Sequence, residues 1–147
     1  MKTIKKVFIV IIICVLGCVP YTSYAQTMAY KYSHSVKDGV KVRGPYTNNI
    51  WYLTFTSDKS KFYITDANGV ATTSNPSGIY MGTENGILVY KGVIPFLGTD
   101  YYYFSSDFKR LNWNSIVDNM NNSGPRMIRV LNYVANPNTS TAPPQLY

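Results

Sequence analysis

The alternation of apolar and polar side chains between closely spaced turn motifs constrains the fold of this chain more than any other feature. It is clearest over residues 50–56 (IWYLTFT) and returns over residues 61–65 (KFYIT). Successive side chains of a β-strand point to opposite faces, so a period of two with β-branched and aromatic residues predicts strands. The face predicted to point inward carries Trp51, Leu53, Phe55, Phe62 and Ile64, and the outward face carries Tyr52, Thr54, Tyr63 and Thr65.

Turn signals separate these strands at intervals that are typical of hairpins. Asp38-Gly39, Asn68-Gly69 and Asn85-Gly86 adopt a positive φ at little cost, and Ser57-Asp58 begins a further turn. The strands predicted between the turns span residues 28–36, 40–43, 50–56, 61–65, 79–83, 87–94, 101–105, 109–113 and 126–134.

These elements predict an all-β fold with one domain over residues 26–135. A single meander of about eight antiparallel strands must curl into a barrel or half-barrel, because an open flat sheet leaves its edges unpaired. Residues 114–123 are expected to form either one helical turn or an irregular loop. Pro125 precedes the last strand and cannot donate a backbone hydrogen bond, which predicts that residues 126–134 lie at a sheet edge. The Pro-, Ser- and Thr-rich residues 136–147 are expected to be a disordered tail.

Residues 1–25 are typical of a secretory signal peptide. Three lysines precede an apolar stretch, and Ser23 and Ala25 supply the small residues of a cleavage site. The apolar stretch is too short to span a bilayer as a helix. We expect cleavage between Ala25 and Gln26, and export to the periplasm, the cell surface or the medium. In an alternative interpretation, Cys18 ends a sequence (VLGC) that resembles a lipoprotein lipobox, and lipidation there would supply the only attachment to a membrane.

Removal of this segment changes both the charge and the cysteine content. The net charge of +7 falls to +4 because three lysines are lost, and both cysteines, Cys14 and Cys18, lie in the segment. The remaining charges are scattered, whereas nucleic-acid binding requires clustered Lys and Arg. We therefore expect no nucleic-acid partner and no disulfide, so the core alone must hold the domain.

Few residues are available for catalysis or metal binding. His34 is the only histidine, and it lies in a predicted strand where a solvent-facing or hydrogen-bonded role is expected. A zinc site needs several His or Cys ligands. The aspartates Asp38, Asp58, Asp66 and Asp107 lie in predicted turns, where this side chain accepts hydrogen bonds from the nearby backbone. These features predict a protein that is not an enzyme and has no metal or other cofactor.

The segment WYLTF at residues 51–55, the Ser-Asp turn after it and the tyrosine-rich later hairpins resemble lipocalin-like small exported bacterial proteins. This resemblance covers residues 49–113 and is one of pattern. The Gly-x-Trp signature of lipocalins is absent, since Asn49 and Ile50 precede Trp51. No ligand-binding residue is therefore carried over from that family.

Tyrosine is the one residue type in excess, with 14 in the chain. Strand propensity and cross-strand pairing favour such residues, but an exposed tyrosine also offers an apolar ring and a hydroxyl for recognition. The alternation places Tyr52, Tyr63 and Tyr103 outward, and we predict that they bind a glycan, a small ligand or an envelope protein. The favoured function is an exported binding or accessory module. The alternative is a structural or assembly subunit of the cell envelope that docks through the edge strand at residues 126–134.

Two hairpins share a local pattern. FTSD at residues 55–58 and FSSD at residues 104–107 are each followed by a basic residue and an apolar residue at equal offsets. The same turn chemistry in two hairpins explains this similarity, and duplication of a functional unit is the alternative.

Overall fold

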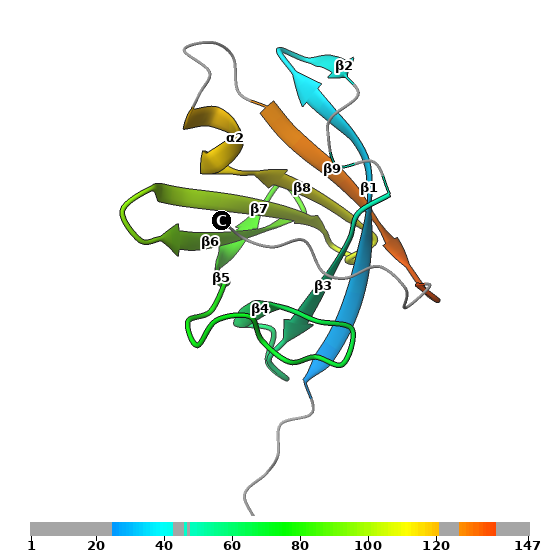
Figure 1. The fold of residues 1–147 in the computed structure, drawn as a ribbon, viewed down its shortest axis with the longest axis vertical. Helices are drawn as coiled ribbons and strands as arrows, with labels where there is room; N and C mark the ends of the chain where they lie inside the picture. The colour runs from blue at the N-terminus through cyan, green and yellow to red at the C-terminus, as the bar shows by residue number, and fades with distance from the viewer. Residues whose placement is uncertain (1–24, 43–45, 47, 121–126, 138–147) are drawn as a thin grey trace, which may run out of the picture.

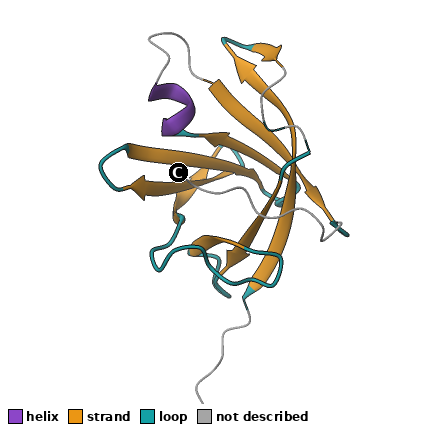
Figure 2. Ribbon diagram, in the orientation of Figure 1, coloured by secondary structure: helices purple, strands orange, loops and turns teal. Residues whose placement is uncertain are grey.

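In the computed structural model, residues 25–42, 46, 48–120 and 127–137 are described, and strands dominate them (Figures 1 and 2). The signal-peptide prediction with its possible lipidation at Cys18, and the predicted tail from residue 138 onward, lie outside the described residues. The elements are β1 (Gln26–Lys37), β2 (Val40–Val42), β3 (Ile50–Phe55), β4 (Lys61–Thr65), β5 (Gly78–Glu84), β6 (Ile87–Ile94), β7 (Gly98–Ser105), β8 (Arg110–Asn114), α2 (Ile116–Met120) and β9 (Met127–Val134).

Eight of these strands form a closed antiparallel barrel. β1 and β3 to β9 follow one another in the order of the chain, and β9 pairs back with β1. β2 lies outside the ring and pairs only with the end of β1. The structure thus confirms the predicted all-β meander and selects the barrel over the half-barrel.

The long strand β1 makes this closure possible. Along one edge, its first half pairs with β3 and its last residues pair with β2. Along the other edge it pairs with β9, from Ala29 opposite Val134 to Lys37 opposite Met127, with a bulge between Tyr32 and His34. Figure 1 shows β1 and β9 side by side across the molecule.

The prediction that the last strand is an edge strand is wrong. β9 pairs with β8 on one side and with β1 on the other. It begins at Met127, after Pro125 in the sequence, so no ladder position in β9 falls on a proline. The strand is therefore not a free edge on which a partner could add another strand.

The inward faces of the strands form an aromatic core, as the alternation predicts. Trp51, Leu53 and Phe55 are buried in one cluster with Phe62 and Ile64. The rings of Phe55 and Phe62 lie 5.4 Å apart between centroids. Further rings from β1, β6, β7 and β8 complete the cluster, and these are Tyr30, Tyr32, Tyr90, Tyr102, Phe104 and Trp113.

The strand boundaries differ from the predicted ones mainly around β7. This strand begins at Gly98 and not at residue 101, because the chain reverses in a tight turn in which Leu97 N donates to Ile94 O. Asp100 is consequently a strand residue on the same face as Tyr102. Within the segment predicted as a helical turn or a loop, Ile116–Met120 is helical.

Candidate functional site

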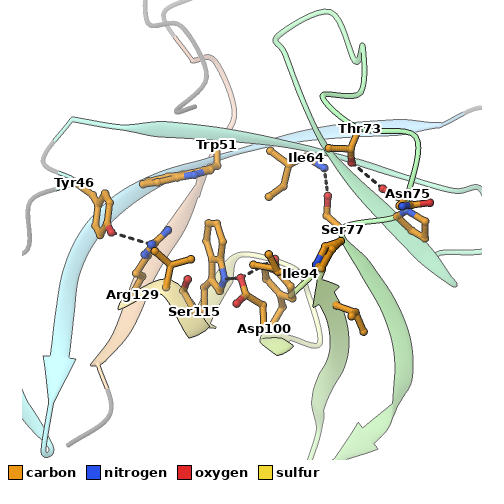
Figure 3. A pocket seen from close by; sticks show the side chains of 16 residues that line it. Tyr46, Trp51, Ile64, Thr73, Asn75, Ser77, Ile94, Asp100, Ser115 and Arg129 are labelled. Atoms are coloured by element: carbon orange, nitrogen blue, oxygen red, sulfur yellow. Dashed lines mark hydrogen bonds between the residues drawn. The ribbon is translucent and has the colours of Figure 1, made fainter. Parts of the chain in front are cut away.

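One end of the barrel holds a pocket of about 360 Å³, where β3 and β7 begin and β4, β6 and β8 end (Figure 3). The opposite end is filled by phenylalanines, including Phe104 and Phe108 with their ring centroids 5.5 Å apart. The barrel is thus solid at one end and hollow at the other. The pocket is lined by Tyr46, Trp51, Ile64, Thr73, Asn75, Pro76, Ser77, Val93, Ile94, Pro95, Asp100, Tyr102, Trp113, Ser115, Val117 and Arg129.

A buried ion pair stands at one side of this pocket. Arg129, from β9, donates from Nε to Oδ2 of Asp118 at 2.6 Å and from Nη2 to Oδ1 at 2.8 Å. The side chains are only 7% and 4% exposed. Tyr46 joins them, because its hydroxyl accepts from Nη2 of Arg129 at 2.8 Å and donates to Oδ1 of Asp118. A bidentate pair of this kind fixes the orientation of the guanidinium as well as adding binding energy.

Two aromatic rings pack against the same guanidinium. Its Cζ lies 4.0 Å from the ring centroid of Tyr46 and 4.3 Å from that of Trp113. Burial, followed by the hydrogen bond to Asp118, raises the pKa of Tyr46 to about 12. The tyrosine hydroxyl therefore keeps its proton at neutral pH and remains a donor to the carboxylate.

A second carboxyl group, Asp100, lies in the wall of the pocket and is 1% exposed. It accepts hydrogen bonds from Trp113 Nε1 at 2.7 Å, from the backbone N–H of Ile116 at 2.7 Å and from the Tyr102 hydroxyl at 3.3 Å. Burial raises the pKa of Asp100, while these donors and the nearby Arg129 act in the opposite direction. Asp100 thereby fixes the Trp113 ring and the start of α2.

The far side of the pocket is formed by the loop before β5. Ser77 Oγ accepts from the Ile64 N–H at 2.9 Å, and Ser77 O lies so close to Gly92 that a Cβ there would approach it to 2.0 Å. Only glycine at position 92 lets the loop lie against β6. Figure 3 shows Thr73, Asn75 and Ser77 facing Arg129 and Tyr46 across the pocket.

The tyrosines predicted from the sequence do not line this pocket. Tyr52 is 3% exposed, so its expected exposure is wrong, and it packs on the outer face of the barrel with Ala29 and Ile50. Tyr63 and Tyr103 are half-buried on β4 and β7, with β5 and β6 between their strands. The structure therefore does not bring the three side chains together into one surface.

Two charged residues at inward strand positions could have indicated the pocket from the sequence. Asp100 falls on the inward face with Tyr102, and Arg129 falls on the inward face with Leu131, so both are charges where the alternation demands apolar residues. A charged residue at an inward position is buried, and buried charges are paired or functional. Starting the seventh strand at residue 101 left Asp100 outside it and hid this signal.

His34 is half-buried, and its Nδ1 lies 3.0 Å from Ser33 Oγ. Within the described part of the chain, no group of three or more His, Cys, Asp or Glu could hold a metal ion. No helix in the described ranges is long and apolar enough to span a membrane. In comparisons with protein-family models, with curated proteins and with solved structures, the chain matches none. The function must therefore be argued from the pocket.

Proposed function

We propose that this chain is an exported, non-enzymatic binding protein that holds a compact ligand in the pocket at the hollow end of its barrel. One observation carries the proposal, namely that the pocket combines aromatic walls with a few fixed polar groups. Small-molecule sites are concave, largely apolar and about 300–1,000 Å³ in volume, with few polar groups that set the orientation of the ligand. At about 360 Å³, this pocket suits a ligand of one or two rings.

The fixed geometry of the polar groups supports a binding role. Arg129 is held by Asp118 and by two rings, and Trp113 is held by Asp100. Side chains that are already held in place lose less conformational entropy when a ligand binds. The pocket is in this sense preorganised.

The carboxyl groups favour binding over catalysis. Asp118 is engaged by Arg129 and Tyr46, and Asp100 accepts three hydrogen bonds. A general base needs a carboxylate within hydrogen-bond reach of a substrate proton. Carboxylates that are committed to structural donors serve this purpose poorly.

Export belongs to the same proposal and has its own test. Cleavage after Ala25 predicts a mature chain that begins at Gln26, which is also the first residue of β1. Intact-mass analysis of protein from the native host should show this N-terminus. A mass corresponding to a diacylglyceryl group on Cys18 would replace secretion with lipid anchoring.

Tryptophan fluorescence tests the binding function directly, because both tryptophans of the chain line the pocket. A library of compact ring compounds should contain members that change the emission and saturate. Val117→Phe, at the pocket rim, should weaken this response, whereas Val70→Phe should not, because Val70 is exposed and does not line the pocket. Equal responses from the two variants, or no response to any compound, would refute the pocket as the binding site.

A further inference from the structure

One part of the Arg129 guanidinium remains uncommitted. Its Nε and Nη2 atoms donate to Asp118 and Tyr46, but Nη1 has no hydrogen-bond partner among the described residues. The residue is only 6% exposed. A buried donor that stays unpaired is costly, and native proteins pair nearly all such groups.

The Nη1 atom is not sealed off inside the protein. The side-chain atoms of the described residues that are sealed off without a partner are Tyr52 Oη and Asn112 Oδ1, and Nη1 is not one of them. Arg129 lines the pocket, and Figure 3 shows its guanidinium at the pocket wall beside Tyr46. Because the rings of Tyr46 and Trp113 hold the guanidinium, the N–H groups of Nη1 point in a fixed direction.

The charges around the pocket select against an ionic ligand. Asp118 already neutralises Arg129, and Asp100 adds a second buried carboxyl group to the wall. A ligand anion would lose its hydration in a pocket where the two carboxyl groups of Asp100 and Asp118 outnumber the one guanidinium of Arg129. A ligand cation would be placed against the guanidinium itself. Burying an unpaired charge is expensive, so neither kind of ion is favoured.

We propose that the pocket takes a neutral, compact ring compound whose carbonyl or hydroxyl oxygen accepts hydrogen bonds from Nη1 of Arg129, while its ring packs against Trp51 and Trp113. This inference rests on the proposed binding function and adds the chemical class of the ligand. The aromatic walls supply apolar contact, and Nη1 supplies a polar anchor.

Four one-ring probes that differ only in their polar group test the proposal on the full chain. Benzamide and benzyl alcohol are neutral acceptors, benzoate is an anion, and benzylamine is a cation at neutral pH. Titrations followed by the NMR signals of the two tryptophan indole N–H groups should show both neutral probes binding at least about tenfold more tightly than benzoate or benzylamine. The cost of burying an ionic charge that has no partner accounts for a factor of this size.

A variant without the buried ion pair provides the matched comparison. Arg129→Met combined with Asp118→Leu removes both charges together, so neither charge is left buried without its counterion, and such replacements are often tolerated. The neutral probes should then lose about tenfold in affinity, because the hydrogen bond from Nη1 is gone. Arg129→Lys, which keeps the charge but lacks a planar fork, should show the same loss.

The outcomes separate the two proposals. If all four probes bind equally, or if benzoate or benzylamine binds most tightly, the neutral-acceptor inference is wrong and the binding function stands. If the double variant binds the neutral probes as tightly as the natural chain does, Arg129 is not the anchor. If no probe shifts either indole signal at millimolar concentration, both the binding function and this inference fail.

Discussion

Phe55 has no exposed surface and lies at the centre of the solid end of the barrel. Its ring contacts those of Phe62, Tyr90, Phe104 and Phe108, with centroids 5.3 to 6.0 Å apart. At the hollow end, Asp100 and Arg129 take two of the inward positions, beside Trp51, Tyr102 and Trp113. The pocket therefore exists because polar residues replace rings at a few inward positions.

A pair of neighbouring substitutions tests the face assignment at the residue scale. Phe55→Ala should lower the free energy of unfolding by about 3–5 kcal/mol, because a large buried ring leaves a cavity. Thr54→Ala should cost only about 1–1.5 kcal/mol, since it loses hydrogen bonds to Thr27 Oγ1 at 2.8 Å and Thr65 Oγ1 at 3.1 Å on the outer face. Urea denaturation of both variants measures the difference, and equal midpoints would contradict the assignment.

Short-range chemistry explains why single elements could be predicted from the sequence. The two Ser-Asp turns have the same hydrogen bonds: Asp58 accepts from Thr56 Oγ1 and the Ser60 N–H, and Asp107 accepts from Ser105 Oγ and the Lys109 N–H. The residue directly after the aspartate has a positive φ in both turns, 55° at Lys59 and 58° at Phe108. These turns and the inward positions of the strands depend on neighbours in sequence, so a local pattern suffices to predict them.

The turn between β6 and β7 offers a prediction at the scale of one element. Ile94 to Leu97 form a turn with Pro95 in its second position, and Phe96 has a φ of 64° although it is fully exposed. This position favours glycine, since other residues are strained there by about 1–2 kcal/mol. Phe96→Gly should therefore raise the free energy of unfolding by about 0.5–1 kcal/mol, after allowing for the greater entropy of glycine in the unfolded chain.

Phe96→Ala is the matched control for this turn. It removes the same exposed ring but keeps a Cβ at the positive φ, so its stability should remain close to that of the natural chain. Thermal and urea unfolding of the three proteins measure the comparison. A Phe96→Gly variant less stable than Phe96→Ala would mean that the strain is not located at this position.

At the scale of the whole molecule, the site depends on contacts that no local pattern reveals. Arg129 comes from the last strand, Asp118 from α2 and Trp51 from β3, and they meet only because β9 pairs with β1 and closes the barrel. The sequence predicted strands and faces, and it left open whether the sheet closes. The predictions that β9 is an edge strand and that Tyr52 is exposed were wrong for this reason, because both depend on long-range pairing and on what covers each face.

Closure of the barrel can be tested with a disulfide between its first and last strands. Val36 lies opposite Ile128 in the β1–β9 pair, and both side chains are half-buried on the outer face. In a background with Cys14→Ser and Cys18→Ser, Val36→Cys combined with Ile128→Cys should form a disulfide in the folded protein. It should add about 2–4 kcal/mol to the free energy of unfolding because it closes a long loop, and reduction should abolish the gain.

Val36→Cys with Ile87→Cys is the control, since β1 and β6 are not neighbours in the sheet. Free thiols in the first pair under oxidising, native conditions would show that β9 does not close onto β1, and the pocket with its Arg129 anchor would then lose its structural basis.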